Sequence, residues 1–230
     1  VIVATVRALK MHGGVAKADL GAENIPAVEI GFANLKTHIE NMKKFGVPVA
    51  VAINKFITDT DSEIELVKKL CSENGCNAVV CEGWEKGGDG AADLAHKVVE
   101  LCDSPCEFKN IYPLDISLKE KIEILAKEIY RASSVEFEGK ALKKLKQFEE
   151  QGFGSLPICM AKTQNSISHD KSLQGAPKDY VFPIRDVQLY SGAGFVVAFA
   201  GDIVDMPGLP KTPAALNIDV DNNGIISGLF

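Results

Sequence analysis

Long apolar runs, an excess of basic charge and paired cysteines are all missing from this sequence. The longest apolar stretches, residues 47–53 and 195–200, are far shorter than the ~20 residues that cross a bilayer, so we expect no transmembrane helix and no membrane partner. The 25 Lys and Arg residues are outnumbered by 31 Asp and Glu residues, and the net charge of −6 argues against a nucleic-acid partner. None of the six cysteines forms a Cys-x-x-Cys pair. This pattern predicts reduced thiols, buried or half-buried, in a cytosolic protein, and Cys81 and Cys159 lie in apolar strand-like runs.

A start methionine and a phosphate-binding P-loop are also absent. The chain begins with Val1 and enters an apolar run at once, so we expect a piece of a longer protein. The pattern Gly-x-x-x-x-Gly-Lys-Ser/Thr occurs nowhere in the chain.

The composition is that of a globular protein. The chain has 230 residues, of which 46% are hydrophobic and 24% charged, enough for one large or two small domains. Short apolar runs alternate with helical spacing in the first half, which predicts an α/β fold with a parallel sheet and flanking helices on both faces. The expected strands are residues 1–6, 47–53 and 77–81, and the expected helices are residues 31–45, 61–74 and 91–102.

Prolines at residues 105 and 113 mark a seam. We therefore expect a first domain over residues 1–110 and a smaller α/β C-terminal domain over residues 111–230. Helical spacing predicts helices at residues 118–130 and 139–151 of the second domain. Short apolar runs predict strands at residues 156–160, 181–189, 195–200 and 225–230.

Ligands of open parallel sheets bind beyond the carboxyl ends of the strands. These ends predict three polar or Gly-rich loops, at residues 7–14, 54–60 and 82–90. The first loop carries two cations, an imidazole and two glycines: Arg7, Lys10, His12, Gly13 and Gly14. Such a loop either receives an anionic group or is a turn whose glycines only permit positive φ.

The other two loops each carry one large aromatic side chain. Phe56 follows the second strand and is either a core plug or an exposed stacking platform. Trp84, the single tryptophan, lies in a Gly-rich loop and either stacks on a flat ligand or folds back onto the sheet. Two aromatics on neighbouring strand ends favour a sandwich around a planar heterocycle. Lys162, after another short strand, either meets a phosphate or belongs to a solvated loop, which is the more common case.

Several long stretches resemble the formate–tetrahydrofolate ligase family across essentially the whole chain. They are VATVRALKMHGG (residues 3–14), VAINKF (51–56), the Trp84 loop, GFGSLPICMAKT (152–163), MPGLP (206–210) and the ending from IDV (218–220) to GLF (228–230). The resemblance implies an ATP-dependent enzyme of one-carbon metabolism that joins formate to N10 of tetrahydrofolate through formyl phosphate, releasing ADP and phosphate. It further implies Mg²⁺ with ATP, a monovalent cation activator, small-molecule substrates and a cytoplasmic homotetramer.

Residue by residue, the resemblance implies that Phe56 and Trp84 bracket the folate ring system. It also implies that Asn54, Ile57 and Val80 line the pocket, and that Arg7, Lys10, His12, Gly13 and Gly14 form a signature near the active site. Some relatives have Pro where Ile57 stands, a change that we expect to affect shape more than chemistry.

The family's P-loop and its formyl-phosphate-binding basic residues lie in an N-terminal portion that this chain does not contain. The resemblance therefore implies an incomplete P-loop NTPase-like fold, with ATP bound mainly by the missing part. We expect the 230 residues alone to be inactive in ligation. Two alternatives remain: a non-catalytic folate or nucleotide binding module, and an oligomerisation fragment.

Overall fold

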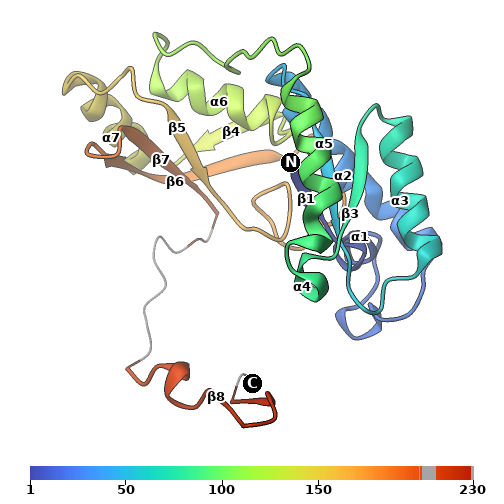
Figure 1. Cartoon of the computed structure of the whole chain (residues 1–230). Helices are drawn as coiled ribbons and strands as arrows, with labels where there is room; N and C mark the ends of the chain where they lie inside the picture. The colour runs from blue at the N-terminus through green and yellow to red at the C-terminus, as the bar shows by residue number, and fades with distance from the viewer. Residues whose placement is uncertain (202, 204–210, 229–230) are drawn as a thin grey trace.

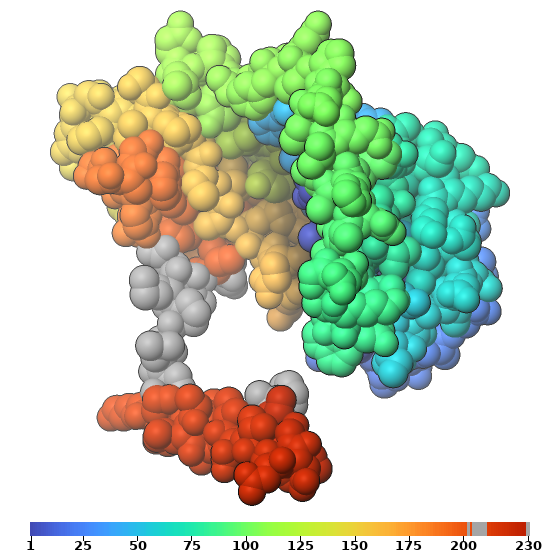
Figure 2. Space-filling view, in the orientation of Figure 1, coloured from blue at the N-terminus to red at the C-terminus, as the bar shows by residue number. Residues whose placement is uncertain are grey.

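A computed structural model describes residues 1–201, 203 and 211–228 (Figure 1). Residues 1–201 contain two sheets, each with its own helices and its own apolar core, and Figure 2 shows these two parts side by side. Residues 211–228 form a short 3-10 helix, η3 (Ala214–Leu216), and a two-stranded ribbon of β8 (Asp219–Val220) and β9 (Ile226–Ser227), and they are exposed throughout. The MPGLP stretch and the last two residues of the expected strand 225–230 lie outside the described residues.

The first sheet is parallel, as the sequence predicts. It has the order β1 (Ile2–Ala4), β2 (Ala50–Asn54), β3 (Asn77–Cys81), and Ile53 pairs with Ala4 on one side and Val80 on the other. β2 is buried on both faces. Val51 and Ile53 belong to the core that α2 (Ile25–Lys44) and α3 (Asp61–Glu73) cover, whereas Ala50 lines a 300 Å³ cavity with residues of α5 (Ala92–Cys102) on the opposite face (Figure 1).

The first helix corrects one expectation. The sequence predicts a loop over residues 7–14, and this prediction is wrong because residues 6–12 form α1 (Val6–His12). The helix starts at once because the Thr5 side chain accepts a hydrogen bond from the Ala8 N–H at 3.0 Å. A 3-10 helix, η1 (Lys17–Asp19), follows it. α2 also begins six residues earlier than predicted, because Asn24 caps it and Pro26 occupies its first turn.

Two glycines bring α1 and α2 into backbone contact. A Cβ on Gly31 would lie 1.8 Å from the Leu9 carbonyl oxygen, and a Cβ on Gly13 would lie 2.0 Å from the Ala27 carbonyl oxygen. Neither position has room for a side chain, so this close approach fixes the place of α1 beneath the carboxyl ends of the strands.

The second part contains a mixed sheet. Its order is β4 (Ser134–Phe137), β6 (Val181–Tyr190), β7 (Phe195–Ala200), β5 (Ile158–Ala161), with β6 and β7 antiparallel and the outer pairs parallel. Both predicted helices are present, as α6 (Leu118–Glu128) and α7 (Gly139–Glu150). They pack on the sheet around a core that includes Leu118, Phe182 and Val196. β4 is not predicted from the sequence, because its four residues are held as a strand by pairing with β6.

Polar side chains of α2 join the two parts. The Asn41 side-chain amide donates to the Ile129 carbonyl at 2.8 Å, and the Asn34 amide donates to the Gly175 carbonyl at the same distance. Arg131 donates to Thr37 Oγ1 at 3.2 Å. Because Asn41 and Thr37 are buried, these bonds satisfy groups that would otherwise lose water without replacement.

Candidate functional site

The carboxyl ends of β2 and β3 lie next to each other and are tied by charge. Asn54 pairs with Cys81, and the Lys55 N–H donates to the Cys81 carbonyl at 3.1 Å. Beyond this last rung, Lys55 Nζ lies 3.2 Å from Glu82 Oε1 and Lys86 Nζ lies 2.6 Å from Glu82 Oε2. The hydrogen bonds from Lys86 and Lys55 lower the pKa of Glu82. The two loops that carry Phe56 and Trp84 therefore start from one shared ion-pair cluster.

Phe56 is not a core plug. Phe56 is 40% exposed and lies in a turn in which the Asp59 N–H donates to the Phe56 carbonyl at 3.0 Å. The Phe56 N–H in turn donates to Asp59 Oδ2 at 2.9 Å. The ring is thus presented to solvent from an internally bonded turn.

Trp84 does not fold back onto the sheet. It is 89% exposed and lies in the short helix α4 (Gly83–Lys86), where the sequence predicts a loop. The base of this segment is closed by the Glu82 N–H, which donates to the Gly90 carbonyl at 2.9 Å, and the 3-10 helix η2 (Asp89–Ala91) leads into α5. Figure 1 shows α4 and α1 at the same end of the first sheet.

Among the five signature residues, Arg7 is the one that contacts the aromatic pair. Its guanidinium carbon lies 5.6 Å from the centroid of the Phe56 ring, within the range of a cation–π contact. This contact places a fixed positive charge of α1 against the ring at the end of β2.

The other four signature residues serve the packing of α1 in this structure. Lys10 is fully buried in an ion pair with Glu63 at 3.0 Å and donates to the Ala22 carbonyl at 2.9 Å. His12 Nδ1 accepts a hydrogen bond from the Gly175 N–H at 3.2 Å, and burial lowers the pKa of His12. Gly13 touches α2, and Gly14 has a φ of 92°, which favours glycine.

The three expected pocket residues differ in exposure. Ile57 is 98% exposed next to Phe56, and Asn54 is half-buried at the end of β2. Val80 is half-buried and packs against the core of the first part.

The hydrogen bonds around the buried Glu63 carboxylate were not predicted from the sequence. Glu63 Oε1 accepts from the Asn24 N–H at 2.9 Å, and Glu63 Oε2 accepts from the Thr60 N–H at 3.2 Å. Burial by itself would raise the pKa of Glu63, but these bonds and Lys10 outweigh it and hold the pKa below its usual range. The available signal was Thr60-x-x-Glu63, a capping-box pattern at the start of α3.

The family model for formate–tetrahydrofolate ligase matches residues 1–230. The chain belongs to the formate–tetrahydrofolate ligase family. It is 55% identical over 231 residues to the formate–tetrahydrofolate ligase of Roseobacter denitrificans, and 54% identical to those of Zymomonas mobilis and Staphylococcus aureus strain JH9. These alignments cover 100% of the chain but 41%, 42% and 41% of the relatives, so the chain spans about two fifths of their length.

Two further sequence expectations for this formate–tetrahydrofolate ligase family member concern its thiols and Lys162. The expectation of buried or half-buried cysteines is wrong for Cys102, Cys106 and Cys159, which are exposed; Cys159 lies on the outer strand β5. Lys162 does not extend into a solvated loop, because it donates to the Thr163 carbonyl at 2.8 Å and also to the Ser166 carbonyl. Burial lowers the pKa of Lys162 to about 8.

The described part of the chain holds no group of three or more His, Cys, Asp or Glu side chains placed to bind a metal ion. No helix within residues 1–201, 203 and 211–228 combines the length and apolar character needed to span a membrane.

Proposed function

We propose that this chain is the folate-binding part of a formate–tetrahydrofolate ligase, and that Phe56 and Trp84 stack on the two faces of the pterin ring. The observation that carries the proposal is the pair of exposed aromatic rings on adjacent, parallel strand ends that the Lys55–Glu82 ion pair ties together. Exposed aromatic rings lose contact with water when a flat heterocycle covers them, which favours binding. Asn54, Ile57 and Val80 would border the same slot.

The reaction proposed for the whole protein is the ATP-dependent joining of formate to tetrahydrofolate. A formate oxygen attacks the terminal phosphorus of ATP, which gives formyl phosphate and ADP. N10 of tetrahydrofolate then attacks the formyl carbon, phosphate leaves, and 10-formyltetrahydrofolate is the product. We propose that Mg²⁺ accompanies ATP and that a monovalent cation activates the enzyme. The signature residues Arg7, Lys10, His12, Gly13 and Gly14 would shape the wall of the site through α1.

We propose that the protein is a cytoplasmic homo-oligomer and that each protomer has two domains with a boundary near residue 110. Light scattering after size-exclusion chromatography measures the oligomeric state directly, and a monomeric mass at all concentrations would contradict the first part of this proposal. Limited proteolysis tests the second part: cleavage within residues 103–117 should release two folded pieces.

Trp84 provides the decisive test of the stacking role, because it is the single tryptophan of the chain. We expect tetrahydrofolate to quench the tryptophan emission of the 230-residue chain in a saturable titration. Phe56→Ala should weaken binding by about 1–3 kcal/mol, the range for base–aromatic stacking in nucleic acids. Phe108→Ala removes another exposed phenylalanine, outside the site, and should leave the dissociation constant unchanged.

Equilibrium dialysis with Trp84→Phe and Trp84→Ala separates stacking from a mere optical signal. The Phe variant should bind more tightly than the Ala variant because it keeps an aromatic face. Equal affinity of Phe56→Ala and the unsubstituted chain, or binding that is indifferent to the loss of Trp84, would sink the proposal.

A further inference from the structure

Asp59 is buried although the three residues before it are exposed. It is 8% exposed, whereas Phe56, Ile57 and Thr58 form the outward side of the turn after β2. A carboxylate at the base of an exposed aromatic turn raises the question of what holds it there, because burying a carboxylate is unfavourable without compensating bonds.

The answer lies in the backbone of Phe56. Both polar backbone groups of this residue bond to Asp59: its N–H donates to Asp59 Oδ2 at 2.9 Å, and its carbonyl accepts from the Asp59 N–H at 3.0 Å. The path from the Phe56 Cα to the ring contains two rotatable bonds, and the Arg7 guanidinium lies 5.6 Å from the ring centroid. With the Phe56 backbone bonded at both its N–H and its carbonyl, the direction of the Cα–Cβ bond from which the ring extends is restrained.

Helix capping does not account for Asp59. α3 begins at Asp61, and its N-cap is Thr60, whose Oγ1 accepts from the Glu63 N–H at 3.3 Å. The Glu63 carboxylate in turn accepts from the Thr60 N–H. That capping box is complete without Asp59. The side chain of Asp59 bonds only to the turn before it, and its Oδ1 is buried with no hydrogen-bond partner among the described residues.

The base of the turn is connected to two helices. Thr60 and Glu63 connect it to the fully buried Lys10, and Lys10 belongs to the same helix as Arg7. Burial is the largest influence on Asp59 and raises its pKa. The Glu63 charge also raises this pKa, whereas the charges of Lys10 and Arg7 lower it. The Asp59 carboxylate therefore lies close to the Lys10–Glu63 ion pair that joins α1 to α3.

We propose that Asp59 is a positioning residue for folate binding: its carboxylate accepts from the Phe56 N–H and thereby holds the backbone from which the Phe56 ring extends. The proposal rests on the proposed stacking function of Phe56. It assigns Asp59 no contact with folate. Its role is to keep the ring pre-oriented, so that binding does not have to restrain a mobile side chain.

Three substitutions separate positioning from charge. Asp59→Ala removes the acceptor, Asp59→Glu keeps the charge but moves the acceptor by one methylene, and Asp59→Asn keeps an acceptor oxygen at the same distance without the charge. We expect the dissociation constant for tetrahydrofolate, from the Trp84 titration, to rise about tenfold or more in the Ala and Glu variants. The Asn variant should stay within about threefold of the unsubstituted chain. Thr58→Ala, an exposed substitution in the same turn, is the matched control and should have no effect.

A double-mutant cycle distinguishes this proposal from the stacking proposal. If Asp59 acts through Phe56, Asp59→Ala should weaken binding no further in a Phe56→Ala background. Equal effects of Asp59→Ala in both backgrounds would overturn the positioning role and leave stacking intact, whereas an inert Phe56→Ala would overturn stacking itself. If Asp59→Ala fails to fold by far-UV circular dichroism, the Asn and Glu variants carry the test. Weak binding by Asn together with normal binding by Glu would then identify a charge effect and refute positioning.

Discussion

Lys10 Nζ lies 3.0 Å from Glu63 Oε1, and both side chains are fully buried. The pair joins α1 to α3 at the carboxyl ends of the first sheet, and three backbone groups add to its hydrogen bonding: the Ala22 carbonyl, the Asn24 N–H and the Thr60 N–H. Arg7 lies one turn before Lys10, and Asp59 lies four residues before Glu63. The buried pair therefore connects α1, which carries Arg7, to the start of α3, which follows Asp59.

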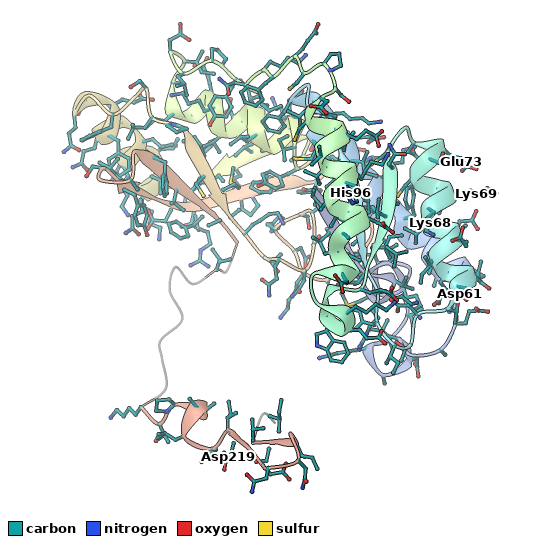
Figure 3. All side chains as sticks on the ribbon, in the orientation of Figure 1. Asp61, Lys68, Lys69, Glu73, His96 and Asp219 are labelled. Carbon is teal, nitrogen blue, oxygen red and sulfur yellow. The ribbon has the colours of Figure 1, made fainter. Side chains whose placement is uncertain are left out.

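Removing the cation of this pair should destabilise the fold strongly. Lys10→Met leaves the Glu63 carboxylate buried without its partner, and we expect a loss of about 3–5 kcal/mol in the free energy of unfolding. Urea unfolding followed by far-UV circular dichroism measures it. Lys69→Met is the matched control, because Lys69 and Glu73 form an exposed pair at 3.9 Å on the outer side of α3 (Figure 3) and exposed pairs contribute at most about 1 kcal/mol. Similar losses in the two variants would contradict this account.

Acid should remove the contribution of Glu63. Its pKa is lower in the folded chain than its unfolded value of about 4.3, so the folded state favours the ionised form. The stabilisation is present above about pH 4.3 and disappears as the pH falls through the lower folded-state pKa. We expect the stability difference between the unsubstituted chain and Glu63→Gln to shrink below pH 4. The raised pKa of Asp59 acts in the opposite sense, and because the Glu63 charge contributes to that rise, losing this repulsion in Glu63→Gln offsets part of the difference. A difference that is flat from pH 7 to pH 3 would be incompatible with this mechanism.

The α1–α2 contact should not tolerate a methyl group. In Gly31→Ala the new Cβ would lie 1.8 Å from the Leu9 carbonyl oxygen, so α1 must move. Overpacking costs about 1–3 kcal/mol, and the displacement should exceed the ~1 kcal/mol that alanine adds to helix propensity. Thermal unfolding should show a lower midpoint, and the folate affinity should fall because Arg7 moves with α1.

Gly139→Ala provides the comparison for this prediction. Gly139 begins α7, and no neighbouring atom lies within 4 Å of the position that its Cβ would take. We expect a change of less than about 0.5 kcal/mol. Equal midpoints for the two alanine variants would show that the α1–α2 approach is not a constraint.

The six cysteines should fall into groups of different reactivity. Cys102, Cys106 and Cys159 are exposed, Cys81 is half-buried, and Cys71 and Cys76 are buried. Burial raises the pKa of Cys71 to about 12 and also raises the pKa of Cys76, so neither is ionised at pH 8. An aromatic disulfide reagent should titrate three thiols rapidly in the native chain and the two buried ones only after unfolding. Cys159→Ser should remove one rapid equivalent, and six equivalents at a single rate would contradict the assignment.

Periodicity was sufficient to predict the parallel sheet and most of the helices, because alternating apolar runs and helical spacing arise from burial against a shared core. The same reasoning failed at residues 7–14. Polar residues and glycines are typical of a loop there, yet Thr5 caps a helix. Lys10 of this helix is neutralised by Glu63, more than fifty positions away. It also missed β4, whose strand conformation depends on pairing with β6.

The candidate site divides in the same way. The sequence alone determined that two aromatics follow neighbouring strands, because parallel strand direction and the adjacency of consecutive strands follow from the βαβ pattern. Only the tertiary structure decided that Phe56 and Trp84 face solvent, that Arg7 lies on the Phe56 ring and Lys10 does not reach it, and that Asp59 holds the turn. Exposure and charge pairing depend on which distant segments of the chain come into contact. Here Gly13 and Gly31 allow the backbones of α1 and α2 to approach each other closely.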